Sequence, residues 1–390
     1  MKPWHRDLTL IKRSRPVFDL DWRSSMESLC QMVRSSRVLV IGGAGSIGAE
    51  VTRILFEIGP AALHVVDANE NGLVDLVRSI RSSAGYATPD FRTICFDMTD
   101  PRAEGIFSHE GGYDAVLNFA AVKHVRSEKD RFSLARMMQV NVELMHRLCM
   151  WAENTGASRL FSVSTDKAAN PVNLMGASKR IMESIGFAFG GGRFRTARFA
   201  NVAFSNGSLL NSFYDRMDLL QPLSAPADVR RFFITHEEAA RLCLLQTFLG
   251  PADTIAVPAA PGEVELTSFT EVVTAVLASR GFEPLVCATE DEARSTPPTE
   301  THWPCFFFNS DTTGEKQYEE FLAQGESCDE SPFREISIIR NSPIPDTRLL
   351  NAVLALDPVE ASQQTMLEHV AAVVPGFSHH ETGRNLDQRM

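Results

Sequence analysis

Hydrophobic and polar residues alternate along the chain with two different periods, and this pattern predicts the order of strands and helices. Short apolar runs that predict buried strands occupy residues 37–42, 62–67, 91–97, 113–121 and 159–165. Apolar residues at helical spacing predict helices at residues 49–58, 70–83 and 140–151. Because strands and helices take turns, the expected fold class is α/β, a doubly wound parallel sheet with right-handed crossovers.

The pattern changes on both sides of this region. Residues 1–35 form an extension with one amphipathic helix, whose apolar face consists of Met26, Leu29, Cys30, Met32 and Val33. We expect this helix to pack on its own domain. In the alternative, its arginines face a membrane surface or a partner. After about residue 200 the elements become short and irregular, as in a smaller region that covers a substrate.

The composition excludes several classes of protein. The 390 residues include 38 basic and 49 acidic side chains, and the formal charge of −11 argues against nucleic acid or an anionic membrane as the main partner. The 7 cysteines are scattered, without metal-ligand spacing, so we expect reduced, packed thiols and no metal site. We find neither a signal-peptide core nor an apolar run of ~18 residues, which predicts a soluble cytoplasmic protein without stable membrane insertion.

A glycine motif follows the first predicted strand and precedes the first predicted helix. Gly42, Gly45 and Gly48 permit a tight turn, close approach of a pyrophosphate to the backbone, and close packing of the helix on the strand. The N-terminus of the helix supplies N–H donors and a positive dipole. The motif therefore predicts a dinucleotide site, with Ser46 and Ile47 among its contacts.

Two aspartates at predicted strand ends refine this site. Asp67 can accept both ribose hydroxyls of an adenosine and would repel a 2′-phosphate, and no Arg or Lys occurs among the next ten residues, which favours NAD over NADP. Asp97 is placed either to accept a hydrogen bond from the adenine amino group or only to cap a turn. The remaining candidate cofactor contacts are Met98, Ala120, Ala121 and Val202.

The stretch from Asp67 to Gly72 also resembles the start of a calcium-binding EF-hand loop. Its twelfth position is Arg78, where such a loop needs a bidentate glutamate, and a strand rather than a helix precedes it. The sequence therefore argues against calcium binding.

The stretch "STDKAANPVNLMGASKR" carries the candidate chemistry. The strand before it delivers Thr165, Asp166 and Lys167 at its carboxyl end, where doubly wound sheets bind their ligands. Met175 and Lys179 are four residues apart, so they share one face of a helix that we expect Asn173 to cap. Lys179 can hold the nicotinamide ribose, whereas Met175 stands where a tyrosine is expected.

Five motifs together resemble the extended short-chain dehydrogenases, and more narrowly the CapD-like UDP-N-acetylglucosamine 4,6-dehydratases of polysaccharide biosynthesis. They are "GGAGSIG", "NFAAVKHVRSEKD", "STDKAANPVNLMGASKR", "RFANVAFSNGS" and "RRFFITHEEA", and the likeness covers roughly residues 36–245. The resemblance implies an NAD-binding Rossmann domain at 36–205 and a substrate-binding region at 206–376, and the polar composition of the last residues predicts a flexible tail at 377–390. The resemblance also implies a UDP-sugar substrate and, by analogy, a homo-oligomer.

In that family a hydride leaves sugar C4, water is eliminated across C5 and C6, and the hydride returns to C6. By resemblance, Asp166 is the acid at C6 and Lys167 the base at C5. A thioether accepts no proton at neutral pH, so Thr165, a water or a relay through Lys179 must deprotonate the C4 hydroxyl. The candidate substrate contacts are Lys123, His124, Asn201, Ser205 and Arg231, with Arg230 as an alternative to Arg231 for the diphosphate.

Two other functions fit the same motifs. A nucleotide-sugar epimerase on this scaffold would return the hydride to C4 or reprotonate C5, but a C4 epimerase has no leaving hydroxyl for Asp166 to protonate. A non-catalytic binder of NAD or a sugar nucleotide would need the glycine motif and Asp67 but would be indifferent to Lys167.

Overall fold

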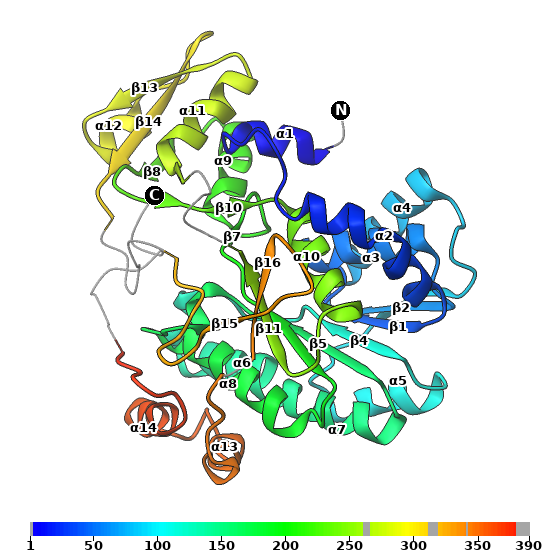
Figure 1. The fold of residues 1–390 in the computed structure, drawn as a ribbon. Coiled ribbons are helices and arrows are strands. Elements are labelled where there is room, and N and C mark those ends of the chain that lie inside the picture. Colours follow the sequence, from blue (N-terminus) through cyan, green and yellow to red (C-terminus); the bar gives the residue numbers. More distant parts are fainter. Residues whose placement is uncertain (1–2, 260–265, 311–318, 341, 380–390) are drawn as a thin grey trace.

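The structure has three layers, with helices on both faces of one large sheet (Figure 1). It is a computed structural model that describes residues 3–259, 266–310, 319–340 and 342–379. Nine strands lie in the order β15-β16-β11-β6-β5-β4-β1-β2-β3, parallel except for β15 and β16. Their bounds are β1 Arg37–Ile41, β2 Ala62–Asp67, β3 Phe91–Cys95, β4 Ala115–Asn118, β5 Arg159–Val163, β6 Phe194–Ala197, β11 Thr254–Pro258, β15 Cys328–Asp329 and β16 Ile336–Ile339.

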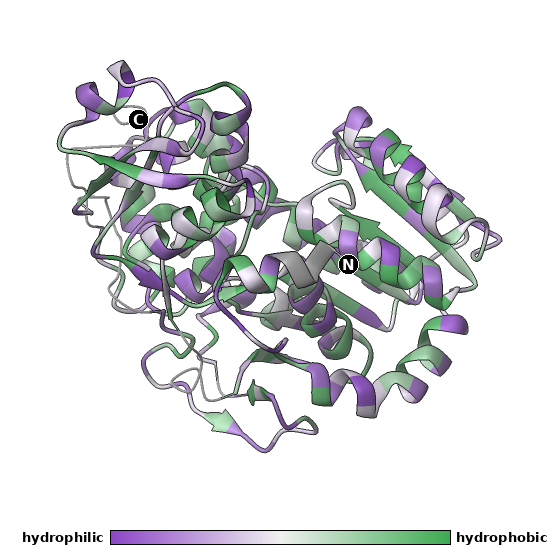
Figure 2. Ribbon diagram, turned by 90° about the horizontal axis from the view of Figure 1, so that it is seen from above, coloured by the Kyte–Doolittle hydropathy of each residue, from purple (hydrophilic) through white to green (hydrophobic). Residues whose placement is uncertain are grey.

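Each strand supplies side chains to both helical layers, as the period of two requires. In β1, Val38 and Val40 belong to one apolar core, and Leu39 and Ile41 belong to the other. Figure 2 shows hydrophobic residues concentrated on the strands and polar residues on the outer faces of the helices. The first core includes α2 Asp19–Arg34, α3 Ser46–Ile58, α4 Glu70–Ala84 and α10 His236–Phe248. The second includes α5 Glu104–His109, α6 Arg131–Met138, α7 Leu144–Thr155, α8 Leu174–Phe189, α13 Thr347–Leu354 and α14 Gln363–Val373.

The predicted fold class is confirmed, and the differences concern element boundaries. Helix α3 begins at Ser46 rather than at residue 49, β3 ends at Cys95, and β4 is shorter than the predicted run. The predicted helix at 140–151 is part of a longer helical segment, in which a π-helical turn, η3 Gln139–Glu143, joins α6 to α7. Apolar spacing alone does not reveal such a turn, because its residues are still buried on one side.

The N-terminal extension packs on its own domain, as predicted. Leu29 and Val33 of α2 are fully buried in the first core. The preceding loop is held by Arg13, whose guanidinium donates to Glu238 Oε1 at 2.6 Å and to the Phe233 carbonyl at 3.0 Å. Helix α1, Pro3–Leu10, lies beside α11 at the opposite end of the extension (Figure 1).

A smaller region rises from the carboxyl-terminal side of the large sheet (Figure 1). It has its own core and the elements α9 Leu209–Asp218, α11 Phe269–Ser279, α12 Glu290–Ser295, β8 Leu223–Pro226, β13 Glu283–Cys287 and β14 His302–Phe308. Two short ladders connect it to the sheet: β7 Asn201–Val202 with β10 Phe233–Ile234, and β9 Arg230–Arg231 with β12 Thr267–Ser268.

The chain returns to the large sheet after residue 205. Strands β11, β15 and β16 extend this sheet, and α13 and α14 pack on α8. The predicted domain boundary at residue 205 therefore does not coincide with the end of the large sheet. That residues after 205 contact the substrate stays a prediction. At the end of the chain, Phe377 packs against the second core and His379 Nε2 lies 3.1 Å from Glu128 Oε2, so residues 377–379 are not a free tail. Residues 380–390 of the predicted tail lie outside the described part.

Two further observations bear on the sequence predictions. In the part of the chain that the structure describes, no helix is both long enough and apolar enough to cross a membrane. No cysteine is in a disulfide, and Cys149, Cys243, Cys287 and Cys305 are buried.

Candidate active site

The glycine loop connects β1 to α3 and leaves its backbone open toward the end of the sheet. Gly42 has a φ of +72°, and a Cβ there would lie 2.5 Å from the Ala120 nitrogen. A Cβ on Gly48 would lie 2.2 Å from the Gly42 carbonyl oxygen, so a larger residue would push α3 away from the turn. These contacts require glycine, and they leave the N–H groups at the start of α3 available to a phosphate.

A cavity of about 260 Å³ lies between this loop and the ends of β2, β3 and β4. Seven of the predicted cofactor residues line it: Gly42, Gly45, Asp67, Asp97, Met98, Ala120 and Ala121. Its position at the carboxyl ends of parallel strands, beside β1 and β4 where the strand order reverses, is where doubly wound sheets bind nucleotides. Ser46, Ile47, Gly48, Lys179 and Val202, the other predicted cofactor residues, lie outside its lining. The Ser46 hydroxyl accepts a hydrogen bond from the Asn206 amide at 2.8 Å instead.

The two predicted aspartates have different surroundings in this cavity. Asp67 Oδ2 accepts from the Ala44 amide at 2.9 Å and so fixes the glycine loop. Asp97 caps its turn through Thr99 and also accepts from Arg136 Nη2 at 2.7 Å. Burial alone would raise the pKa of Asp97, but the hydrogen bonds from Thr99 and the charge of Arg136 lower it. The sequence did not point to Arg136, which lies outside every recognised motif.

The segment after β5 brings the three predicted catalytic residues into contact. Thr165 Oγ1 donates to Asp166 Oδ1 at 2.7 Å, and Lys167 Nζ lies 3.2 Å from the same oxygen. The Asp166 side chain is only 8% exposed, whereas that of Lys167 is 43% exposed. The carboxylate therefore lies at the base of the site, and the amine is accessible to a ligand.

Helix α8 places the other two predicted residues beside this segment. Asn173 caps the helix as predicted, accepting from the Gly176 amide at 2.9 Å. Lys179 Nζ donates to the Val163 carbonyl at 3.1 Å, and burial lowers the pKa of Lys179 to about 8. Met175 is buried in the second core, and its amide donates to Glu128 Oε1 at 2.9 Å.

The loop after β4 meets the loop after β7. Lys123 Nζ donates to the Asn206 carbonyl at 2.9 Å, and Gly207 leaves room for the His124 ring, since a Cβ there would lie 3.2 Å from Nε2. Burial lowers the pKa of His124, and the charges of Lys123 and Arg126 lower it further. Ser205, which directly precedes Asn206, is buried. The structure therefore brings Lys123, His124 and Ser205 together near the glycine loop, where Asn206 contacts Ser46.

His236, which the sequence did not single out, belongs to the same neighbourhood. Burial lowers the pKa of His236 to about 4, and the charges of Lys123 and Arg53 act in the same direction. His236 is therefore uncharged near pH 7, and the positive charge that an anionic ligand needs would come from Lys123 and Arg53, in a chain with a net negative charge.

Asn201 and Arg231 lie on neighbouring short strands and share one carboxylate. Glu319 Oε1 accepts from Asn201 Nδ2 at 3.0 Å and lies 3.7 Å from Arg231 Nε. The Arg231 side chain is 10% exposed, whereas that of Arg230 is 55% exposed and pairs with Glu271 at 3.3 Å. Burial therefore separates the two arginines that the sequence left as alternatives, and Arg231 is the one beside the candidate substrate residues.

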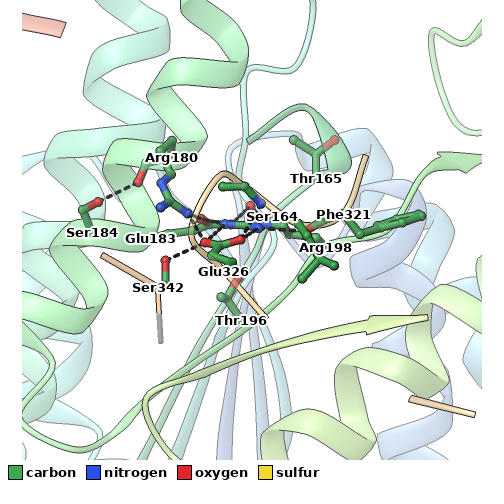
Figure 3. A network of polar contacts seen from close by, with 12 residues as sticks. Ser164, Thr165, Arg180, Glu183, Ser184, Thr196, Arg198, Phe321, Glu326 and Ser342 are labelled. Carbon is green, nitrogen blue, oxygen red and sulfur yellow. Dashed lines mark hydrogen bonds and ion pairs between the residues drawn. The ribbon is translucent and has the colours of Figure 1, made fainter. Parts of the chain in front are cut away.

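A buried network of charges underlies the whole site (Figure 3). The Arg198 guanidinium donates to Glu183 Oε2 and to Glu326 Oε2, both at 2.6 Å, and Ser164 Oγ donates to Glu183 Oε1 at 2.6 Å. Burial alone would lower the pKa of Arg198, but the two glutamates raise it well above its usual value. Arg180 completes the network through both glutamates. No sequence motif predicted it, because its members come from β5, α8, the end of β6 and the segment at 319–326.

The fold and these contacts define an α/β protein with a Rossmann-like sheet, a cavity at the carboxyl ends of its strands and an Asp166–Lys167 contact after a central strand. The comparisons with known proteins identify its family. The sequence profile of the family described as "Polysaccharide biosynthesis protein" matches residues 38–341, so the chain belongs to this family of nucleotide-sugar-modifying enzymes.

Three curated relatives are 26–29% identical to this chain over the parts that match. An uncharacterized membrane protein of Methanocaldococcus jannaschii is 29% identical over 66% of this chain and 77% of its own length. The capsular polysaccharide biosynthesis protein CapD of Staphylococcus aureus is 27% identical over 56% of this chain, and the chain spans only 37% of it. A UDP-N-acetylglucosamine 4,6-dehydratase (inverting) of Campylobacter jejuni is 26% identical over 55% of this chain and 64% of its own length.

Solved structures share the extended short-chain dehydrogenase fold. Pen from Bacillus thuringiensis has a TM-score of 0.63 at 20% identity and covers 79% of this chain and 87% of its own. DesIV, a dTDP-glucose 4,6-dehydratase from Streptomyces venezuelae solved with NAD and TYD bound, has a TM-score of 0.54 at 20% identity, over 74% of this chain and 88% of its own. The UDP-Glc/GlcNAc 4-epimerase of Campylobacter jejuni has a TM-score of 0.56 at 16% identity, over 77% of this chain and 94% of its own. Dehydratases and an epimerase thus share this architecture, so the reaction must be argued from the site.

Proposed function

We propose that this protein is an NAD-dependent nucleotide-sugar 4,6-dehydratase that converts UDP-N-acetylglucosamine to a UDP-4-keto-6-deoxy-hexosamine for polysaccharide or glycan biosynthesis. The observation that carries the proposal is the contact between Lys167 Nζ and Asp166 Oδ1, 3.2 Å apart at the end of β5. A base and an acid in contact suit an elimination across two neighbouring carbons. The family and the similarity to a UDP-N-acetylglucosamine dehydratase support the substrate class.

The protons of this elimination balance within the pair. Lys167 takes the C5 proton while Asp166 gives a proton to the departing C6 hydroxyl, so that a C5=C6 double bond forms and water leaves. The step starts from a neutral amine and a protonated carboxyl group, which one proton transfer across the observed contact produces. It ends with an ammonium and a carboxylate, the two charges that a contact at this distance stabilises.

The residues around the cavity suit NAD as the cofactor that would accept a hydride from the sugar and return it. The glycine loop and the start of α3 would hold the pyrophosphate, and Asp67 would accept the ribose hydroxyls. Lys179 would hold the nicotinamide ribose from the end of β5. NADP fits less well, because Asp67 would repel its 2′-phosphate.

The C4 hydroxyl proton needs an acceptor other than Met175. Thr165 Oγ1 and Lys179 Nζ are the candidate acceptors of this proton, directly or through a water. With its pKa at about 8, a substantial fraction of Lys179 is neutral in weakly alkaline solution. We therefore favour a relay that ends at Lys179.

Incubation with UDP-N-acetylglucosamine in deuterated water tests the proposal. A 4,6-dehydratase gives a product that has lost water and carries deuterium at C5, which mass spectrometry and NMR detect. A product of unchanged mass formula, apart from exchange, with altered stereochemistry would replace the proposal with the epimerase. Bound NAD without any product would replace it with the non-catalytic binder.

A further inference from the structure

Glu319 is a buried carboxylate of the site that no motif of the sequence analysis included. Its side chain is only 6% exposed. Its Oε1 accepts from Asn201 Nδ2 at 3.0 Å and from the Phe232 amide at 3.2 Å, and lies 3.7 Å from Arg231 Nε. These three donors come from β7, from β9 and from Phe232, which lies between β9 and β10. One carboxylate oxygen therefore joins two segments that carry candidate substrate residues.

The segment that carries Glu319 is anchored by the charge network around Arg198, in which Figure 3 shows Phe321 and Glu326. Two residues further along, the Phe321 carbonyl accepts from Arg198 Nη1 at 2.8 Å. Glu326 then binds the same guanidinium at 2.6 Å and accepts from the Ala323 amide at 2.7 Å. Although burial opposes the ionisation of Glu326, Arg198 and Arg180 lower its pKa to about 2. The segment 319–326 is thus held by an ionised, fully buried anchor.

The same network also holds the catalytic segments. Ser164 precedes Thr165 directly, and its hydroxyl donates to Glu183 at 2.6 Å. Glu183 lies one turn after Lys179 on α8, and Arg198 begins the loop that leads to Asn201. Glu319 therefore has a fixed relation to the acid–base pair as well as to the substrate residues.

We propose that Glu319 is a positioning residue of the substrate site, which holds Arg231 and Asn201 in the arrangement that binds the nucleotide sugar. The proposal rests on the proposed function, because it assumes that Arg231 and Asn201 face a UDP-sugar. Without the carboxylate, the Arg231 guanidinium loses its ion pair with Glu319, and the Asn201 side-chain amide loses its hydrogen bond to Glu319. Both side chains are then less ordered before the substrate binds, which lowers the affinity for the substrate.

The charge of Glu319 makes the opposite outcome physically reasonable, so the test can fail. A carboxylate near Arg231 also repels an anionic diphosphate, and burial together with the charge of Asp166 raises the pKa of Glu319. Glu319 increases the affinity for the substrate only if the gain from ordering Arg231 and Asn201 exceeds the electrostatic repulsion between its carboxylate and the diphosphate. The sign of the change in affinity decides between these effects.

The experiment measures equilibrium binding of UDP-N-acetylglucosamine to the NAD-loaded full chain in a Lys167→Ala background, in which turnover does not consume the ligand. We expect Glu319→Ala to weaken binding about tenfold or more, at unchanged NAD affinity and unchanged melting temperature. Glu319→Gln keeps an acceptor for Asn201 and Phe232, so it should restore part of the loss. Combining Glu319→Ala with Arg231→Ala should cost less than the product of the two single effects, because Glu319 acts through Arg231.

The matched control is Glu330→Ala, which removes an exposed carboxylate from the same part of the chain and should leave binding unchanged. Unchanged or tighter binding in Glu319→Ala, or additive effects with Arg231→Ala, would overturn the inference while the proposed function stands. If Glu319→Ala does not fold, the same criterion applies to Glu319→Gln: affinity equal to the parent overturns it. Failure of the Lys167→Ala parent to bind UDP-N-acetylglucosamine would instead remove the proposed function, and the inference with it.

Discussion

The cofactor region and the chemical region of this site are built in different ways. The cofactor region uses the backbone of one continuous loop, Gly42 to Gly48, and the ends of β2, β3 and β4. The chemical region uses side chains from segments that are far apart in the sequence, including 164–183, 198–208, 230–232 and 319–326. The geometry of the cofactor region depends on the backbone conformations that its glycines allow. The geometry of the chemical region depends on a buried network that holds several segments together.

This difference teaches where a substitution should act. A change in the cofactor region should alter dinucleotide binding and little else, because its contacts are local. A change in the network beneath the chemical region should disturb stability and chemistry together, because Arg198 and its two glutamates link several elements. The predictions below test this contrast, from the largest expected effect to the smallest.

Lys167→Ala should separate the two regions most clearly. Loss of a general base is expected to lower the rate of dehydration by about 10²- to 10⁴-fold. NAD should remain bound with unchanged affinity, because Lys167 contacts Asp166 and does not line the cavity. Product formation and NAD titration measure the two effects. Lys129→Ala removes an exposed lysine and serves as the control; retained turnover in Lys167→Ala would remove this residue from the role of base.

Glu326→Ala should reveal the network as the support of the chemical region. Among the described residues, removal of Glu326 leaves Glu183 as the remaining charged partner of Arg198 and Arg180. Breaking a buried ion pair costs about 3–5 kcal/mol. The free energy of unfolding from urea denaturation measures this loss. Glu330→Ala, at an exposed position, should change it by less than about 0.5 kcal/mol. Equal stabilities of the two variants would show that the network does not support the fold.

Asp67→Asn should affect the cofactor region alone. An amide is a weaker acceptor than a carboxylate for the ribose hydroxyls and for the Ala44 amide, so the affinity for NAD should fall about 10- to 100-fold, equivalent to about 1.4–2.8 kcal/mol. The affinity for NADP should fall less, because the repulsion of its 2′-phosphate is removed. Calorimetry with both dinucleotides measures the change, and Asp75→Asn on the exposed side of α4 is the control. An unchanged ratio of the two affinities would argue against the ribose role.

The differences in construction also explain what the sequence could and could not predict. The glycine loop was predictable because Gly42, Gly45 and Gly48 lie within seven residues between a strand and a helix. Thr165, Asp166 and Lys167 were predictable because they follow a buried strand directly. Glu319 was not, because only the folded chain brings it to Asn201 and Arg231. No local pattern marks such a residue.

Helices show the same limit. The apolar spacing of residues 140–151 predicted a helix correctly but gave no sign of the π-helical turn at Gln139–Glu143. That turn contains Asn141, whose amide donates to Ser178 Oγ and to the Val122 carbonyl, both at 2.9 Å. The residue thus links α8 to the loop before Lys123. The sign of this turn in the sequence was a polar asparagine, Asn141, among the apolar positions of the predicted helix.

The pH dependence of turnover should show whether Lys179 accepts the C4 proton. An amine accepts a proton only in its neutral form, and the pKa of Lys179 is lowered to about 8 by burial. At pH values below about 8 the neutral fraction, and with it kcat/KM, should fall about tenfold per pH unit. The rising limb should therefore lie near pH 8 and should disappear in Lys179→Arg. A profile without a rising limb between pH 6 and 9 would leave Thr165 or a water as the acceptor.

Met175→Leu should have the smallest effect, and its size decides how the missing tyrosine is understood. The side chain is 4% exposed and belongs to the second core, where a Met to Leu exchange of similar volume costs less than about 1.5 kcal/mol. Because the proposed mechanism gives the sulfur no proton to transfer, turnover should fall by less than about tenfold. Its amide should still donate to Glu128, so the start of α8 keeps its place. A loss of turnover beyond about 100-fold, equivalent to about 2.7 kcal/mol of barrier, would mean that the thioether itself takes part in the reaction. A small loss would place the chemistry in Asp166, Lys167 and their neighbours, and would leave Met175 as a packing residue in an active site that works without a tyrosine.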